Sequence, residues 1–238
     1  MQDYKKTILS TRPVDGQLIQ QAASRSILLD IVPFIETEPV LSIEIQQEIE
    51  LAATELATVV FTSMNAVTAV ITMLNDVLPE WRIYCMGHRT KELVEAYFGK
   101  DAIAGIAENA GLLAEQIIEE GNTDELIFFC GDQRRNELPD KLEANDITVT
   151  EIVVYQTINT PKQLNKSYDA VLFFSPSAVE SFFSKNKLAA DCIVFAIGAT
   201  TANTVRSRCS NKIVTGKSPA KNKLVEQAIA ALNESVEK

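Results

Sequence analysis

The sequence predicts an α/β protein made of two similar parallel-sheet α/β domains, the second inserted in the first. Two observations indicate this fold class. Short apolar segments alternate with amphipathic helical segments along the whole chain, which is typical of parallel sheets with helices on both faces. One set of motifs also occurs twice, because residues 61–67 resemble 173–179, and residues 86–90 resemble 197–201. Such an internal repeat indicates two copies of one structural unit.

Two segments mark where the first domain is interrupted. Residues 31–37 (IVPFIET) and 151–157 (EIVVYQT) each contain an apolar run followed by an aromatic residue and a threonine. We interpret them as the two crossings of a hinge, with Tyr155 at the hinge. Residues 1–36 and 160–238 are predicted to form the first domain, residues 40–152 the inserted domain, and residues 37–39 and 153–159 the crossings.

The elements follow from apolar periodicity, capping residues and glycines. Ser42, Ser63 and Ser175 stand where helix caps are expected, and Ser218 with Pro219 has the same signature before the last helix. Gly99 can terminate a helix. In the helix predicted at 43–56, one apolar face is formed by Ile45, Ile49, Ala52 and Leu56. Strands are predicted at 7–10, 27–35, 59–62, 82–86, 126–130, 151–157, 170–174 and 192–197. Helices are predicted at 17–26, 43–56, 64–78, 90–98, 111–120, 137–145, 176–184, 200–208 and after 219.

Composition excludes several classes of function. The formal net charge of −10 argues against nucleic acid and anionic membranes as partners. No run of 18 apolar residues occurs, and the first residues lack the apolar core of a signal peptide, so a cytoplasmic location is expected. The four cysteines show no C-x-x-C spacing and are interpreted as reduced core thiols. The single histidine, His88, gives little basis for a zinc site or a Ser-His-Asp system.

Four helix N-termini are the candidate binding groups. They follow predicted strands at Ser63, at Gly87 to Thr90, at Ser175 and at Gly198 to Thr201. Open α/β sheets bind ligands at the carboxyl ends of their strands, where helix N-termini offer free N–H groups and a positive dipole end. If the domains face each other, these termini favour a ligand with several carboxylates or phosphates. Each serine taken alone is explained equally well as a helix cap.

The same residues resemble a known family. The 11–13 opening (TRP), the segments 61–67 and 174–179, the Gly87-x-x-Thr90 turn, residues 154–157 (VYQT) and residues 197–202 together are similar to uroporphyrinogen-III synthase in order and spacing. The resemblance implies two α/β domains joined by a two-stranded linker. It also implies a hydro-lyase of heme biosynthesis that cyclises hydroxymethylbilane to uroporphyrinogen III, with inversion of ring D and loss of water.

Residue by residue, the resemblance places the proposed acid at Tyr155. Arg12, at the end of the first strand, is an added candidate for contact with an anion. The implied substrate-binding positions are Ser63, Asn65, Gly87, Thr90, Ser175, Ser177, Ala178, Gly198 and Thr201. The chain departs from the family at 130–132 (CGD), where many members have an arginine-glycine pair, so that a role of that arginine passes to Arg134 or is absent.

The resemblance further implies no cofactor, no metal, and a polycarboxylate small molecule as substrate. A monomer is expected. The competing hypothesis is a non-catalytic two-domain hinge protein that closes on a small polyanionic ligand. Tyr155 in the hinge and the order of the motifs favour the enzyme. Tight binding without turnover would favour the alternative.

Overall fold

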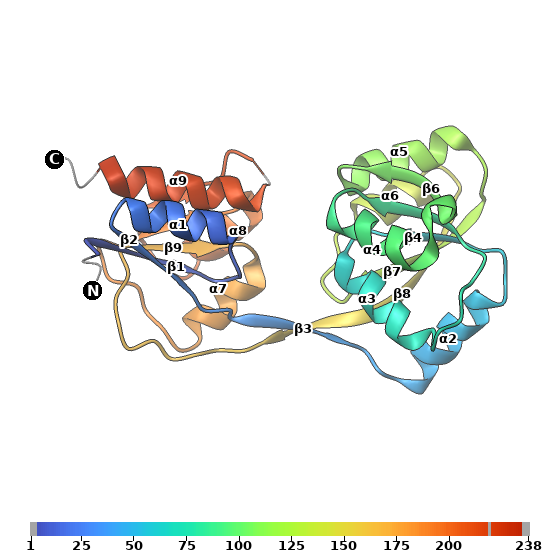
Figure 1. Cartoon of the computed structure of the whole chain (residues 1–238), viewed down its shortest axis with the longest axis horizontal. Coiled ribbons are helices and arrows are strands. Elements are labelled where there is room, and N and C mark those ends of the chain that lie inside the picture. Colours follow the sequence, from blue (N-terminus) through green and yellow to red (C-terminus); the bar gives the residue numbers. More distant parts are fainter. Residues whose placement is uncertain (1–3, 219, 235–238) are drawn as a thin grey trace. The chain divides into compact units, whose positions relative to one another are not determined.

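The chain folds into two compact units, shown in the computed structural model of Figure 1, which describes residues 4–218 and 220–234. Unit 1 comprises Met1–Glu36 and Ile158–Lys238, and unit 2 comprises Thr37–Thr157. Each unit is built on its own sheet, and the prediction of an α/β protein with parallel sheets is confirmed. No helix of the described residues is long and apolar enough to cross a membrane.

Unit 1 has a five-stranded sheet in the order β11-β10-β9-β1-β2, in which neighbouring strands run parallel. Its strands are β1 (Lys6–Ser10), β2 (Ile27–Ile31), β9 (Ala170–Phe173), β10 (Ile193–Ala196) and β11 (Ile213–Thr215), and its helices are α1 (Gly16–Ser24), α7 (Pro176–Phe183), α8 (Ala199–Arg206) and α9 (Lys221–Glu234). Helices α1 and α9 cover one face of the sheet around Ile8 and Phe195, and α7 and α8 cover the other around Val171 and Phe182.

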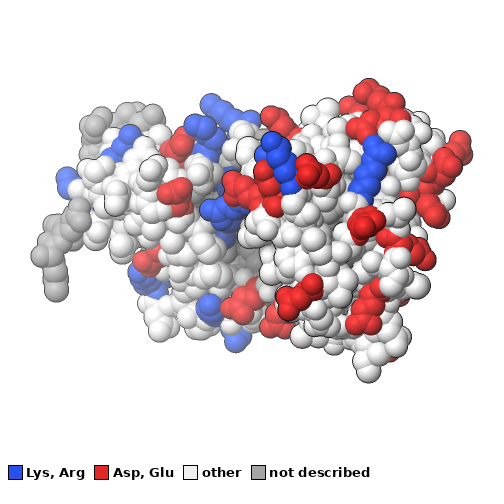
Figure 2. Space-filling view, turned by 45° about the vertical axis from the view of Figure 1, so that its right-hand side comes forward, with Lys and Arg blue, Asp and Glu red and all other residues white. Residues whose placement is uncertain are grey.

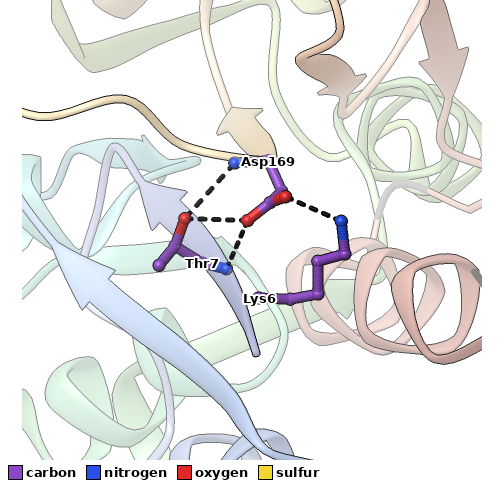
Figure 3. A network of polar contacts seen from close by, with 3 residues as sticks. All are labelled: Lys6, Thr7 and Asp169. Atoms are coloured by element: carbon purple, nitrogen blue, oxygen red, sulfur yellow. Dashed lines mark hydrogen bonds and ion pairs between the residues drawn. The ribbon is translucent and has the colours of Figure 1, made fainter. Parts of the chain in front are cut away.

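The central pair of unit 1 is held at its amino end by Asp169. Its carboxylate accepts hydrogen bonds from Lys6 Nζ at 2.8 Å, Thr7 N at 2.8 Å and Thr7 Oγ1 at 3.0 Å (Figure 3). In return, the backbone N–H of Asp169 donates to the carbonyl oxygen of Thr7 at 3.0 Å. These contacts join β1 to β9, which are separated by about 160 residues of sequence, and so set the register of the pair.

Unit 2 has a six-stranded sheet in the order β3-β8-β7-β4-β5-β6. Its strands are β3 (Ile35–Pro39), β4 (Thr58–Phe61), β5 (Arg82–Met86), β6 (Ile103–Ala107), β7 (Glu125–Gly131) and β8 (Thr148–Asn159), and its helices are α2 (Ile43–Ala53), α3 (Met64–Met73), α4 (Arg89–Phe98), the short 3-10 helix η1 (Lys100–Ala102), α5 (Ala110–Glu120) and α6 (Glu137–Glu143). Helices α2, α3 and α4 cover one face, where Phe61, Phe98 and Phe129 stack, and α5 and α6 cover the other.

The two sheets share one strand order. Apart from β3, the sheet of unit 2 reads β8-β7-β4-β5-β6, and the sheet of unit 1 reads β2-β1-β9-β10-β11. The helix after each strand also corresponds, since α3 follows β4 as α7 follows β9, and α4 follows β5 as α8 follows β10. The motifs that repeat in the sequence therefore occupy equivalent positions in the two units.

The two segments that cross between the units pair with each other as β3 and β8. The N–H of Thr160 donates to the carbonyl oxygen of Phe34, and the N–H of Val40 donates to that of Val154, both at 2.9 Å. Residue numbers that rise on one strand while they fall on the other indicate an antiparallel ladder.

Several element boundaries differ from those predicted. The strand predicted at 27–35 is two strands, since Pro33 has no N–H to donate and the chain turns between Ile31 and Ile35. Helix α3 ends at Met73, not near 78, because Asn75 and Asp76 adopt positive φ angles of 47° and 66°. Strands β6 and β11 are not predicted by the sequence pattern. Helix α2 ends at Ala53, so Leu56 lies beyond it and is 84% exposed, whereas the periodicity predicts it on the buried face. Pro219 lies outside the described residues.

Candidate active site

The candidate site residues follow the carboxyl ends of the strands in each sheet. Ser63, Asn65, Gly87 and Thr90 lie there in unit 2, after β4 and β5. In unit 1 the same edge carries Arg12, Ser175, Ser177, Ala178, Gly198 and Thr201, after β1, β9 and β10. The order of both sheets reverses direction at one place, between β1 and β9 in unit 1 and between β7 and β4 in unit 2. Such switch points form the ligand-binding crevices of open α/β sheets.

The switch point of unit 1 is fixed by buried hydroxyl groups. Thr11 Oγ1 donates to the carbonyl oxygen of Leu172 at 2.8 Å, which joins the end of β1 to β9. Ser10 Oγ donates to the carbonyl oxygen of Arg12 at 2.7 Å, and the guanidinium carbon of Arg12 lies 5.4 Å from the centre of the Phe174 ring. These contacts place Arg12 at the carboxyl edge as predicted, with its side chain packed against an aromatic face.

Two of the four helix N-termini are capped by their serines. Ser63 Oγ accepts from the N–H of Asn65 at 3.1 Å, and Ser175 Oγ accepts from the N–H of Ala178 at 3.2 Å. Both serines have extended backbone conformations, and Pro176 occupies the first turn of α7. At these two termini one N–H is thus occupied by the cap, so the capping interpretation of both serine hydroxyls is correct.

The other two N-termini have no side-chain cap. Helix α4 begins after His88 and α8 after Gly198, and neither residue makes a capping hydrogen bond through a side chain. Each helix carries a buried threonine in its first turn: Thr90 is 7% exposed and Thr201 is 2% exposed. Within the residues that the structure describes, neither hydroxyl makes a hydrogen bond. These two equivalent termini therefore keep more donor capacity for an anion than the serine-capped ones.

The turn before α4 holds a non-glycine residue in a glycine-like conformation. His88 has φ 61° and ψ −131°, and its side chain is exposed. This region of backbone space costs an L-residue free energy, and such residues cluster at ligand sites. The preceding Gly87 is tied to β6, because its N–H donates to the carbonyl oxygen of Ala107 at 2.8 Å.

Tyr155 lies against Gly131, which is not among the candidate site residues predicted from the sequence. A Cβ atom added to Gly131 would lie 2.4 Å from Tyr155 Cζ and 2.7 Å from its hydroxyl oxygen, so the phenol ring lies directly over Gly131. The register of β7 and β8 shifts here, where Gly131 pairs with Tyr155 after Cys130 pairs with Val153. Bulges of this kind re-aim side chains next to active sites.

Asp132 stabilises the shifted register. Its N–H donates to the carbonyl oxygen of Tyr155 at 3.1 Å, and its carboxylate accepts from the N–H of Thr157 at 2.9 Å. The departure from the family at 130–132 thus positions the strand that carries Tyr155. Arg134 is bound to Glu151, with Nε at 2.6 Å from Oε2, and this pairing neutralises its charge.

The described residues contain no group of three or more His, Cys, Asp or Glu side chains that could hold a metal ion. All four cysteines are free thiols, and three of them are buried, as the sequence predicted. Burial raises the pKa of Cys85 and of Cys130 to about 11 and that of Cys192 to about 12. Because only the thiolate is a strong nucleophile, these buried thiols are unsuited to covalent catalysis.

A comparison with protein-family models matches residues 17–226 to the model described as Uroporphyrinogen-III synthase HemD. The chain belongs to the uroporphyrinogen-III synthase family. Members of this family are cyclising hydro-lyases of tetrapyrrole biosynthesis that act on a small polypyrrole molecule. A comparison with curated proteins finds no match.

Solved structures show the same fold. The uroporphyrinogen-III synthetase of Helicobacter pylori has a TM-score of 0.66 and 16% sequence identity, with 95% of this chain and 99% of that chain covered. A mutant uroporphyrinogen III synthase of Thermus thermophilus has a TM-score of 0.60 and 14% identity, with 96% and 99% covered. At these identities the likeness shows the fold alone.

The net negative charge of this family member comes from unit 2. Unit 1 contains 15 Lys and Arg against 10 Asp and Glu, a net charge of +5, and unit 2 contains 7 against 22, a net charge of −15. In Figure 2 the acidic side chains gather mainly on the right-hand part of the surface that faces the viewer. The net charge of −10 therefore does not describe the carboxyl edge of the unit 1 sheet, where no acidic residue lies between β1 and Asp15 or between β9 and Glu180.

Proposed function

We propose that this chain catalyses the closure of hydroxymethylbilane to uroporphyrinogen III, with Tyr155 as the acid and the helix N-termini as carboxylate sites. The observation that carries the proposal is the family match over residues 17–226. The Tyr155 ring held over Gly131 and the two uncapped termini supply groups suited to that chemistry.

The substrate is a flexible polycarboxylate, and binding requires donors that do not depend on the net charge of the protein. Each helix N-terminus stabilises a nearby anion by about 0.3–1 kcal/mol. Thr90 and Thr201 add a hydroxyl donor at the two uncapped termini. The termini of unit 1 also lie in the unit with a net charge of +5, which favours the approach of an anion.

The chemical step needs a proton for the departing hydroxyl group. The pyrrole nitrogen next to the hydroxymethyl carbon supplies the electron pair that breaks the C–O bond, and the phenol of Tyr155 gives its proton to the leaving oxygen, so that water is released. The electrophilic carbon then bonds to the substituted α carbon of the terminal ring. The bond from that α carbon to its methylene bridge breaks, and the bridge bonds to the unsubstituted α carbon of the same ring, which inverts the ring. The proton that this second α carbon loses returns to the phenolate of Tyr155, so that one water is released in all. Holding the linear substrate in the conformation that ring closure requires can lower the activation barrier by about 7–11 kcal/mol in well-oriented systems.

The experiment is to supply freshly made hydroxymethylbilane and to separate the uroporphyrinogen isomers. We expect the inverted isomer III as the enzymatic product, measured after subtraction of the uncatalysed closure, which gives the uninverted isomer. Tight binding of the substrate with only the uninverted isomer, at the background rate, would instead identify a hinge protein that binds a polyanion without turnover.

The proposal includes a cytoplasmic monomer that uses no metal or cofactor. The four free cysteines support a reducing compartment. Dialysis against a strong chelator is expected to leave the rate of isomer III formation unchanged. A loss that returns on addition of a metal ion would contradict this part of the proposal.

A further inference from the structure

Helix α2 in unit 2 exposes an apolar stripe to solvent. Ile43 is 74% exposed and Leu51 is 64% exposed, and the exposed Gln47 lies between them at intervals of four residues. Residues at this spacing lie along one side of a helix. Ile49 and Ala52 on the opposite side are buried in the core of unit 2. The helix thus exposes two large aliphatic side chains on its outward side, in addition to the apolar residues on its core side.

Exposed aliphatic residues continue beyond both ends of the helix. Leu41 precedes α2 and is 73% exposed, and Leu56 follows it and is 84% exposed. Single exposed leucines are common on protein surfaces, but four such residues within sixteen positions form a concentration that marks interaction sites.

A hollow adjoins the stripe at Leu56. It has a volume of about 580 Å³ and lies at the amino ends of β4, β5 and β6, the edge of the sheet opposite to the candidate active site. Trp81 is one of its lining residues; it is 3% exposed and donates its indole N–H to the carbonyl oxygen of Ala52 in α2 at 2.8 Å. The hollow therefore lies next to the C-terminal end of α2.

Carboxylates border both the stripe and the hollow. Glu44 and Glu48 lie one turn apart on α2, Glu55 follows the helix, and all three are exposed. Glu80 and Asp101 line the hollow, and they form no ion pair within the described part of the chain. The one basic residue that lines it, Arg82, is already paired with Glu120 at 2.8 Å.

We propose that this surface docks a basic protein partner through an amphipathic segment, whose apolar side covers Ile43 and Leu51 and whose cationic side chains meet the surrounding carboxylates. The hollow beside Leu56 accepts one cationic anchor side chain of that segment. A symmetric contact with a second copy would bring the same carboxylates face to face, which opposes self-association. An anionic lipid surface is repelled for the same reason.

The test uses a labelled synthetic helix of about 16 residues with a leucine stripe flanked by arginines, and measures its binding to the full chain by fluorescence anisotropy. Ile43→Ser combined with Leu51→Ser is expected to weaken binding by about 10-fold or more. Glu44→Gln combined with Glu48→Gln is expected to weaken it by about 3-fold at low salt and by little at high salt.

Matched controls lie on another surface of the same unit. Leu112→Ser changes the exposed leucine of α5, and Glu119→Gln with Glu125→Gln removes two exposed carboxylates far along the sequence from α2. These variants are expected to bind the helix like the wild type. The α2 variants should also keep the wild-type rate with hydroxymethylbilane, so the outcome is independent of the proposed function.

Three binding results would each overturn the inference: no binding of the helix by the wild type, equal losses in the control and α2 variants, or equal binding of a control helix whose leucines are replaced by serine. A fourth is self-association in sedimentation that disappears with Ile43→Ser and Leu51→Ser, since that would identify a second copy as the occupant.

Discussion

Replacing Gly131 by alanine tests whether the position of the Tyr155 phenol matters for the reaction. The added Cβ would lie 2.4 Å from Tyr155 Cζ, whereas carbon atoms in contact are about 3.5–4.0 Å apart, so the ring must move by about 1 Å or more. The atoms that clash are at the far end of a half-buried side chain, which can swing aside. We therefore expect a loss of stability below about 1 kcal/mol, less than in a rigid core.

The effect on catalysis should be much larger. A displacement of about 1 Å can cost about 10²-fold in rate, and loss of a general acid costs at least as much. Gly131→Ala is thus expected to lower kcat by about 10²-fold, as is Tyr155→Phe. The double variant should be no slower than Tyr155→Phe alone, because both changes remove the same proton donor. The remaining enzymatic product should still be isomer III.

Gly105 provides the matched control. A Cβ there would lie 2.6 Å from Cδ1 of the buried Tyr84 ring, whose hydroxyl donates to Glu120 at 2.5 Å and cannot move freely. Gly105→Ala should therefore cost about 1–3 kcal/mol of stability and leave kcat intact below the unfolding temperature. The assays are initial rates with isomer separation and denaturant unfolding. A wild-type rate for Gly131→Ala, or losses that multiply in the double variant, would refute the reasoning.

Three further outcomes are expected. Thr201→Val should raise KM by about 10-fold with little change in stability, because the hydroxyl has no partner to lose within the described residues; an unchanged KM would contradict this. Ser175→Glu should raise KM at least as much through charge repulsion, whereas Ser42→Glu, which removes the cap of α2, should lower only stability, by about 1 kcal/mol. Asp169→Asn should lower the free energy of unfolding by about 1–3 kcal/mol at neutral pH. Burial raises the pKa of Asp169, but hydrogen bonds from Lys6 and Thr7 and the charge of Lys6 lower it further, to a net value below the ordinary one. This stabilisation is present above about pH 4 and is lost as pH falls through the lower folded pKa, so the difference between Asp169→Asn and wild type in urea unfolding should shrink in acid.

The fold could largely be predicted from the sequence because strands such as β9 and, apart from Thr58, β4 are apolar and are followed by serine caps. The missed strands had weaker signals. Strand β6 (Ile103–Ala107) contains Gly105 and two alanines, which have low strand propensity, and β11 has only three residues. Both are edge strands whose formation depends on a neighbour already in place.

The site could be predicted only in part. Sequence alone could not separate the serine-capped termini from the uncapped ones, since that distinction depends on which N–H each hydroxyl reaches. The role of Gly131 could not be predicted either, because its contact with Tyr155 depends on a register shift between β7 and β8. The available signal was a glycine at the end of a strand, which indicates close approach of another group.

The insertion of unit 2 has a consequence for the order of folding during synthesis. Strand β1 must wait for β9, since Ile8 pairs with Ala170, whereas all strands of unit 2 lie between Ile35 and Asn159. Unit 2 can therefore fold as soon as it leaves the ribosome, while the first 36 residues still lack their central partner. Its folding brings Val40 and Val154 together, which shortens the loop that must close for β1 to meet β9 and reduces the entropy cost of that closure. Folding of the inserted unit thus brings the two separate segments of unit 1 close enough to pair.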